Sequence, residues 1–270
     1  FLVGVCINVY QEMNGNPRID AMGIAQDNGA MEGKEVRLGA GATALWSIVT
    51  TVTSNGSVNG MHDSTMPISG LMEMLNMQIN TWFGGVGVGW MNYFTFIIIA
   101  VFISGLMVGR TPEFLGKKIE PYEMKWSVLV CLATPIAILV GSGLAAVVPS
   151  VMDSLNNGGA HGFSEMLYTY SSCGGNNGSA FAGFNANTVF LNVSLGLVML
   201  FARFLPIIGT LAIAGSLAGK KKIATTAGTM STTNGMFVFL LIVVVLLIGA
   251  LSFFPALALG PLAEFFGSIA

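Results

Sequence analysis

The chain has 270 residues, of which 53% are hydrophobic and only 9% are charged, and its formal net charge at pH 7 is −2. Because soluble domains carry about a quarter of charged residues, this composition excludes an ordinary soluble domain and indicates a membrane protein. The sequence has no basic run suited to nucleic acid. The three cysteines, Cys6, Cys131 and Cys173, lie far apart and predict neither a disulfide framework nor a metal site.

Four apolar runs are long enough to cross the hydrocarbon layer of a membrane, which takes roughly 20 residues of helix. The first seven residues, 1–7, are typical of the end of a further apolar helix. The predicted spanning segments in chain order are 93–109, extended back to residue 82 by Gly-rich sequence, 126–149, 187–219 and 236–263.

Two further apolar pieces, residues 42–51 and 163–172, are too short to span. Each has about ten residues, which corresponds to about 15 Å of helix. Each is followed by a loop rich in Gly, Asn and Ser and then by a full span. The order of half-helix, polar loop and full helix therefore occurs twice and predicts an internal repeat of about 120 residues.

The two polar loops, "TSNGSVNG" at 53–60 and "SSCGGNNG" at 171–178, align in two ways. One register pairs Ser54 with Ser172. The other pairs the dipeptide Asn55–Gly56 with Asn177–Gly178. The sequence does not choose between these registers.

Short loops rich in Lys and Arg are typical of the cytoplasmic side of a membrane. Residues 110–125 hold four such side chains and residues 220–235 hold Lys220, Lys221 and Lys222, so both segments are predicted to be cytoplasmic. Residues 8–41 and 150–161 are predicted to lie outside. Both polar loops then enter the membrane from the outside.

Irregular backbone at membrane depth is tolerated only where it is buried in protein or lines a water-filled path. One such loop is compatible with a surface connection, but two matching loops favour a pore. Backbone carbonyls can replace the hydration shell of an alkali cation, and Gly lets the backbone approach it. Neither loop contains Asp or Glu, which favours K⁺ or Na⁺. The predicted filter residues are Ser54, Asn55, Gly56, Ser57, Val58, Asn59, Cys173, Gly174, Gly175, Asn176, Asn177 and Gly178.

Four motifs resemble the potassium-binding A subunits of Kdp potassium-transporting ATPases, the KdpA family: "GRTPEFLGKKIE" at 109–120, "HGFSEMLY" at 161–168, "NNGSAFAGFNANT" at 176–188 and "ALALGPLAEFF" at 256–266. The resemblance implies an all-α membrane protein of the K⁺ channel-like transporter superfamily, with four helix–pore loop–helix repeats around one filter. It identifies this chain with the C-terminal half. The implied units are 1–41, 42–109 (third repeat), 110–125, 126–219 (fourth repeat), 220–235 and 236–270 (final helix).

The resemblance implies a subunit of a bacterial inner-membrane complex that binds external K⁺ and passes it through an intramembrane tunnel to a P-type ATPase subunit, KdpB, with KdpC and KdpF as further partners. It implies no cofactor. The chain has no nucleotide-binding motif, so ATP hydrolysis is assigned to a partner. The alternatives are a passive or ion-coupled K⁺ transporter of the same superfamily and a non-transporting membrane scaffold. Asn80 stands near the place where the family often has an acid.

Arg203 is the single charge within the third span. A charge at the bilayer centre is costly, so Arg203 should face the protein interior. It is predicted either to hold carbonyls or a buried acid, or to act as a positive charge below the filter that stops K⁺ from running through.

The remaining polar residues near the loops are interpreted as structural. His62 and His161 have no ligand spacing, and Glu165 is expected to cap the second half-helix. The Met-rich stretch 61–77 is predicted to serve packing. The glycines of "FGGVGVG" at 83–89 are predicted to allow close helix packing or to unwind the span that follows.

Overall fold

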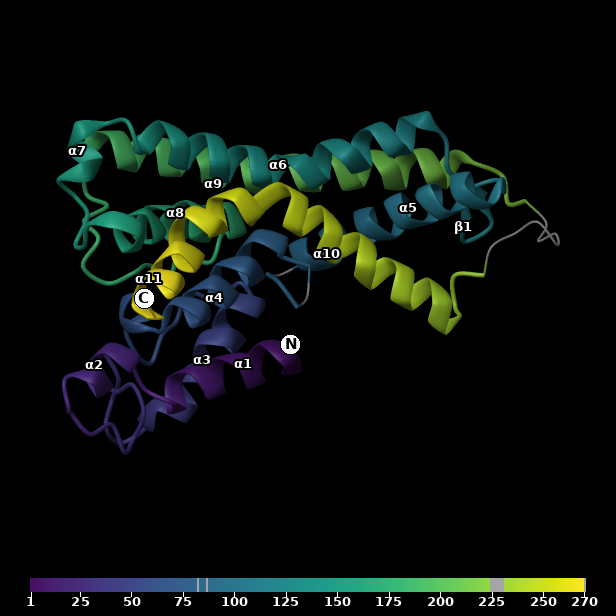
Figure 1. The fold of residues 1–270 in the computed structure, drawn as a ribbon. Helices are drawn as coiled ribbons and strands as arrows, with labels where there is room; N and C mark the ends of the chain where they lie inside the picture. The colour runs from purple at the N-terminus through teal and green to yellow at the C-terminus, as the bar shows by residue number, and fades with distance from the viewer. Residues whose placement is uncertain (82, 86, 224–230, 270) are drawn as a thin grey trace.

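The computed structural model describes the chain except for residues 82, 86, 224–230 and 270 (Figure 1). Its described part is almost entirely helical, with one two-stranded antiparallel sheet. The elements are α1 (Leu2–Met13), α2 (Pro17–Ala21), α3 (Gly39–Val52), the 3₁₀ turn η1 (His62–Ser64), α4 (Pro67–Ile79), α5 (Val88–Val108), β1 (Glu113–Phe114), β2 (Lys117–Lys118), α6 (Pro121–Ala145), α7 (Pro149–Met152), α8 (Gly159–Gly175), α9 (Val189–Gly219), α10 (Gly235–Leu257), the π-helical turn η2 (Ala258–Leu262) and α11 (Ala263–Ile269).

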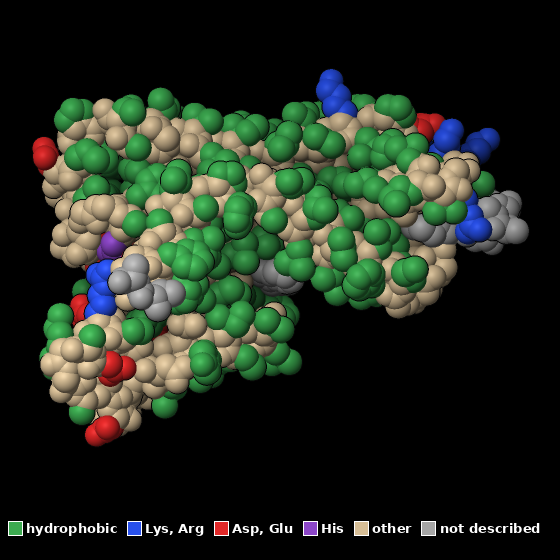
Figure 2. Space-filling model, viewed as in Figure 1, with side chains coloured by type: hydrophobic (Ala, Val, Ile, Leu, Met, Phe, Trp, Pro, Cys, Tyr) green, Lys and Arg blue, Asp and Glu red, His purple; other side chains and the backbone are tan. Residues whose placement is uncertain are grey.

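Four helices are long and apolar enough to cross a membrane, which confirms the predicted number of spans among the described residues. They are α5, α6, α9 and the continuous segment Gly235–Ser268 that begins with α10. Their surfaces carry large exposed apolar side chains, such as Leu197 and Phe204 of α9, as expected for helices that face lipid. Figure 2 shows that the charged side chains on this face lie toward the two ends of the molecule.

Polar caps set where the long helices begin, and they account for small errors in the predicted boundaries. Helix α6 begins at Pro121, not at residue 126, because Glu120 and Glu123 form a reciprocal capping box. At the start of α9, the Thr188 side chain accepts a hydrogen bond from the backbone N–H of Leu191. The predicted cytoplasmic segment 220–235 lies partly outside the described residues.

The helices α6 and α9 form a long pair along one edge of the molecule, with α8 against one end of it (Figure 1). Close approach is possible because Gly209 of α9 lies against Val130 and Trp126 of α6. At the other end, Gly141 of α6 leaves room for the ring of Tyr170 of α8. The pair therefore holds α8 in place from one side.

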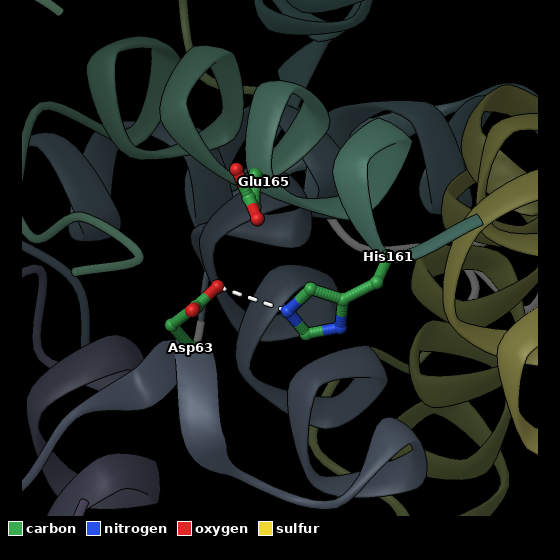
Figure 3. A group of neighbouring side chains, drawn as sticks. All are labelled: Asp63, His161 and Glu165. Atoms are coloured by element: carbon green, nitrogen blue, oxygen red, sulfur yellow. Dashed lines mark hydrogen bonds and ion pairs between the residues drawn. The ribbon is translucent and has the colours of Figure 1, made fainter. Parts of the chain in front are cut away.

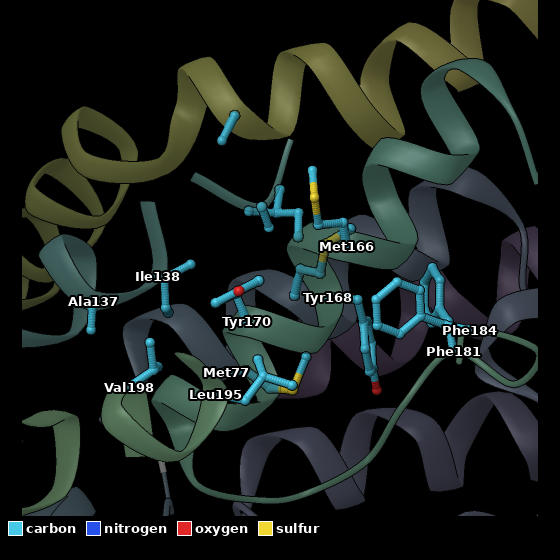
Figure 4. Close-up of a cluster of buried hydrophobic side chains, with 14 of the residues drawn as sticks. Met77, Ala137, Ile138, Met166, Tyr168, Tyr170, Phe181, Phe184, Leu195 and Val198 are labelled. Atoms are coloured by element: carbon cyan, nitrogen blue, oxygen red, sulfur yellow. The ribbon is translucent and has the colours of Figure 1, made fainter. Parts of the chain in front are cut away.

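Two half-helices, α3 and α8, match the two predicted short segments but are longer at both ends. Helix α8 is enclosed by the other elements, and its segment Leu167–Ser172 is entirely buried, whereas α3 leaves Leu45 and Trp46 exposed. Tyr168 and Tyr170 belong to a core that joins α8 with α4, α6 and α9 (Figure 4). A second core joins α5 and α10.

Helix α4 is an element that the sequence did not predict. It fills the Met-rich stretch, and Met74 and Met77 are fully buried, as expected for a packing role. After α4, the described residues before α5, which begins at Val88, belong to no regular element. Asn80, Gly85 and Gly87 all have positive φ in this segment. The third repeat therefore has two helices after its half-helix, α4 and α5, whereas the fourth has the single continuous helix α9. Gly84, Gly85 and Gly87 precede α5, and Gly89 within it allows close packing, because its Cβ would lie 2.1 Å from the Gly84 carbonyl oxygen.

Candidate ion-binding site

Each half-helix ends in the same kind of turn. Ser54 follows α3 with φ 53°, and Asn176 follows α8 with φ 58°, so the backbone turns through the left-handed region after each half-helix. The next residue in each case then donates its backbone N–H to the last turn of the half-helix. These bonds are Asn55 N to Thr50 O, 2.9 Å, and Asn177 N to Ser172 O, 3.1 Å.

The asparagine after each of these turns closes a second turn with its own side chain. Asn55 Oδ1 accepts the backbone N–H of Ser57 at 2.8 Å, and Asn177 Oδ1 accepts that of Ser179 at 2.9 Å. Such side-chain turns are typical of Asn. These matching bonds align Asn55–Gly56 with Asn177–Gly178, the second of the two registers that the sequence left open, although φ is +81° at Gly178 and not positive at Gly56.

The prediction that the second loop already includes residues 173–175 is wrong, because α8 continues to Gly175. The glycines there serve close packing. A Cβ on Gly174 would lie 2.6 Å from the side chain of Ile138, and one on Gly175 would lie 3.1 Å from the carbonyl oxygen of Met77. The last carbonyls of a helix lack helical partners and can accept hydrogen bonds from other segments. The Gly175 carbonyl oxygen lies 3.2 Å from the Ser54 hydroxyl, so the end of α8 adjoins the first loop.

The two loops touch each other. A Cβ built on Gly56 would lie 2.2 Å from the backbone oxygen of Asn177 and 3.3 Å from the backbone nitrogen of Ser179. Residues separated by about half the chain are thus brought into backbone contact. Only glycine at position 56 permits this contact.

The carbonyl groups of the first loop are partly engaged by α3. The Thr50 hydroxyl lies 2.8 Å from the carbonyl oxygen of Asn55 and 2.7 Å from that of Ser57. The Ser57 carbonyl oxygen also accepts the indole N–H of Trp46 at 3.1 Å. Val58 is exposed. The hydrogen bonds from α3 thus hold the turn at 54–57 of the first loop, before Val58 and the half-buried Asn59.

A small cleft lies between the two turns and the break in the third repeat. Arg203 enters this cleft from α9, and its Nη2 lies 3.5 Å from the carbonyl oxygen of Asn176. Within the described residues Arg203 has no acidic group within 4.0 Å. The cleft is lined by Ser54, Asn80, Gly85, Val88, Gly174, Gly175, Asn176, Ala202 and Arg203.

Asn80 belongs to the same site, although the sequence singled it out only as a departure from the family pattern. The Ser54 hydroxyl donates to Asn80 Oδ1 at 2.8 Å, and the Asn92 side chain donates to the Asn80 carbonyl at 3.2 Å. The backbone N–H of Gly85 donates to the Thr53 carbonyl at 3.2 Å. The break between α4 and α5 is therefore attached directly to the first loop.

On another side of the molecule, His161 lies between two carboxylates. Its Nε2 is 2.9 Å from Asp63 Oδ1 (Figure 3), and its Nδ1 is 2.8 Å from Glu264 Oε1. Both ring nitrogens therefore donate, which requires a protonated imidazole. Burial opposes this charge, but hydrogen bonds to Asp63 and Glu264 outweigh burial and raise the pKa of His161 to about 10.

The prediction that Glu165 caps α8 is wrong. The helix begins six residues earlier, and the Glu165 carboxylate accepts the backbone N–H groups of Asn156 and Asn157, both at 2.8 Å, in the preceding loop. Asp63, His161 and Glu165 hold donor atoms within 4.8 Å of one another, a spacing compatible with a cation. Their donor atoms are already engaged, so the cluster is structural. Asp63 and His161 line a cleft of about 670 Å³.

His62 is buried, and burial lowers its pKa to about 4, so the ring is neutral at pH 7. Its Nδ1 lies 2.7 Å from the hydroxyl of Tyr168 in α8. This contact, between residues 106 positions apart, was not predicted, and no short motif in the sequence indicates it.

The chain matches the family described as "Potassium-transporting ATPase A subunit" over residues 1–266. It is 66% identical to the potassium-transporting ATPase potassium-binding subunits of Bacteroides thetaiotaomicron and Phocaeicola vulgatus, each over 98% of this chain and 48% of the relative. It is 61% identical to the subunit of the same name from Clostridium perfringens, over 100% of this chain and 48% of the relative.

The chain thus spans about half the length of the curated relatives that it matches. Its matched region includes both half-helices, both loops and the four long helices. With two-thirds of its residues identical to those of the first relatives, the resemblance drawn from four motifs extends to nearly the whole chain. The chain belongs to the family of potassium-transporting ATPase A subunits.

Proposed function

We propose that the chain supplies two adjacent pore loops of a K⁺-selective filter in the potassium-binding subunit of an ATP-driven uptake complex. The observation that carries this proposal is the pair of turns at 54–57 and 176–179, which share a hydrogen-bond pattern and touch through Gly56 and Asn177. Both turns are uncharged and lie at the ends of half-helices. The relatives are named for potassium binding, which supports the choice of ion.

The chemistry of the turns suits an alkali cation. A half-helix C-terminus carries partial negative charge, and unpaired carbonyls there can replace water around a cation. A monovalent ion needs no carboxylate, and the segments 53–60 and 171–178 contain none. We propose that Gly56 and Gly178, with their neighbouring carbonyls, form part of the ion's coordination.

Arg203 supports a barrier beneath these loops. Its guanidinium is directed at the Asn176 carbonyl and lines the cleft between the loops and Asn80. A positive charge there repels a cation that leaves the filter toward the cytoplasm. The ion is then proposed to leave sideways through an intramembrane tunnel toward the ATPase subunit, KdpB, in a complex that also holds KdpC and KdpF.

The test uses a full-length subunit that carries this sequence, assembled with its ATPase partner. K⁺-stimulated ATP hydrolysis and K⁺ uptake are measured against K⁺ and Na⁺ concentration. Gly178 has φ +81°, so Gly178→Ser strains the loop although no atom lies within 4 Å of the added Cβ. We expect a weaker preference for K⁺ over Na⁺ in this variant.

The matched control is Gly196→Ala in α9, where the added Cβ meets nothing within 4 Å and φ is ordinary. It should leave the K⁺ dependence unchanged. Wild-type K⁺ preference in Gly178→Ser would remove this loop from the filter. Uptake that proceeds without ATP would instead favour a passive or ion-coupled transporter.

A further inference from the structure

A buried line of hydrogen bonds connects the third repeat to the loop of the fourth. It begins at His62 in η1, whose Nδ1 lies 2.7 Å from the Tyr168 hydroxyl. The Tyr168 hydroxyl is 2.8 Å from Ser179 Oγ, which lies 3.0 Å from Asn177 Oδ1. The side chains of His62, Tyr168 and Ser179 are at most 5% exposed. The line thus ends on the asparagine that closes the second turn.

The backbone N–H of Ser179 can only donate, so the Asn177 atom that it meets is the amide oxygen, which also accepts the Ser172 hydroxyl at 2.6 Å. The Ser179 hydroxyl, the Tyr168 hydroxyl and His62 Nδ1 can each donate or accept. When the Ser179 hydroxyl donates to Asn177, it accepts from Tyr168, whose oxygen then accepts the N–H of His62 Nδ1.

In this arrangement His62 carries its proton on Nδ1. Glu73 Oε2 lies 3.4 Å from the same Nδ1, and neither carboxylate oxygen of Glu73 has a hydrogen-bond donor among the described residues. Both His62 and Glu73 belong to the third repeat, so the line crosses from one repeat to the other.

We propose that Tyr168 is a positioning residue for the ion filter: its hydroxyl, oriented by His62 of the third repeat, holds Ser179 and Asn177 and thereby sets the shape of the fourth loop. The inference rests on the proposed function of that loop. Tyr168 does not line the cleft beneath the loops. It acts through Ser179 and Asn177.

The packing around Tyr168 allows its hydroxyl to be removed without removing its ring. Its ring is fully buried and stacks on Phe181, with ring centroids 4.2 Å apart. Phenylalanine retains the ring and its stacking. Loss of the hydroxyl leaves the buried Nδ1 of His62 without this partner and frees the Ser179 hydroxyl to rotate, and buried polar groups left unpaired are costly.

Tyr170 offers a matched control on the same helix. It is also fully buried, and its hydroxyl also meets a serine, Ser194 Oγ at 2.7 Å. Ser194 lies in α9, away from the loop, and Figure 4 shows Tyr170 on the side of Ile138 and Val198, apart from Phe181. Tyr168→Phe and Tyr170→Phe therefore remove the same atom from similar surroundings, and only one of these atoms touches the loop.

The experiment compares both variants in the assembled full-length complex. We expect Tyr168→Phe to raise the KM for K⁺ about five- to tenfold with little change in kcat, and to reduce the preference for K⁺ over Na⁺. Tyr170→Phe should change neither, although both variants lower the thermal midpoint. Ser179→Ala should reproduce the KM effect, and the double variant Tyr168→Phe/Ser179→Ala should be no worse than either single one.

Equal K⁺ dependence in Tyr168→Phe and Tyr170→Phe would overturn the inference, as would additive KM effects of Tyr168→Phe and Ser179→Ala. If Tyr168→Phe does not assemble, Ser179→Ala alone decides, and an unchanged KM there refutes the line. Gly178→Ser separates this failure from failure of the proposed function. If Gly178→Ser alters ion preference while Tyr168→Phe does not, the loop is a filter but Tyr168 does not position it.

Discussion

The contact between the two loops makes Gly56→Ala the most informative single substitution. The added Cβ would lie 2.2 Å from the Asn177 carbonyl oxygen and 3.2 Å from its carbon, and real Cβ atoms essentially never approach within 3.0 Å. The obstacle is backbone, so no side-chain rotation relieves it. Gly56 does not have a positive φ, so alanine brings no intrinsic backbone strain and the contact alone is tested.

The size of the effect follows from the displacement. The loops must separate by about 1 Å, and overpacking of this kind costs about 1–3 kcal/mol. If this cost falls on the ion-binding conformation, K⁺ affinity decreases by about 5- to 150-fold. The fold around the loops should persist, because α3 and α8 are held by contacts that do not involve Gly56.

The assay is K⁺-stimulated ATP hydrolysis by the assembled complex over a range of K⁺ concentrations, with the amount of assembled complex measured in parallel. Gly143→Ala in α6 is the control, since its Cβ meets nothing within 4 Å at an ordinary φ. Unchanged K⁺ affinity in Gly56→Ala would refute the reasoning. It would mean either that the loops are not in contact or that their contact does not shape an ion site.

Three further predictions concern the charge below the loops, the orientation and the pH response. Arg203→Met, which roughly keeps the volume and removes the charge, should produce K⁺ leak or loss of coupling to ATP hydrolysis while K⁺ binding is partly retained; a fully coupled, leak-free variant assigns Arg203 a structural role. Cysteines placed at the exposed Lys118 and Lys221 should be shielded from an impermeant external thiol reagent, whereas one at the exposed Gly158 should react, and the opposite pattern would reverse the orientation. Because the pKa of His161 is raised to about 10, the stability that its ion pairs contribute is fully present below pH 6.5 and is lost as pH rises through about 10. The thermal midpoint should fall over that range in wild type and fall less in His161→Asn. An equal fall of the thermal midpoint in both proteins would contradict the ion pairs of His161 with Asp63 and Glu264.

The long helices were predictable because a run of about 20 apolar residues has one low-energy solution in a bilayer. Their ends were less so, because a cap such as the reciprocal Glu120–Glu123 pair depends on side-chain geometry. Helix α4 was missed for a different reason. It is short and carries polar residues, Glu73 and Asn76 among them, that are buried by partners from other segments. A sequence pattern shows polarity but not its burial.

The loops show a similar division. Their composition predicted their place after a half-helix, but the register depends on bonds from the Asn55 and Asn177 side chains to the backbone two residues on. Gly174 and Gly175 were assigned to the loop because glycine lets backbone carbonyls approach an ion, whereas here it lets neighbouring segments approach a helix. The line from His62 to Ser179 joins distant segments, so no local spacing indicates it.

The backbone contact between Gly56 and Asn177 has a consequence for protein engineering. Neither loop can be exchanged alone, because a donor loop with a different backbone path meets an unchanged neighbour. A chimera that transplants only residues 53–60 from a distant relative should therefore assemble poorly or lose ion preference. One that transplants residues 53–60 together with 176–179 retains the contact. The two loops are one modular unit, although half of the chain separates them.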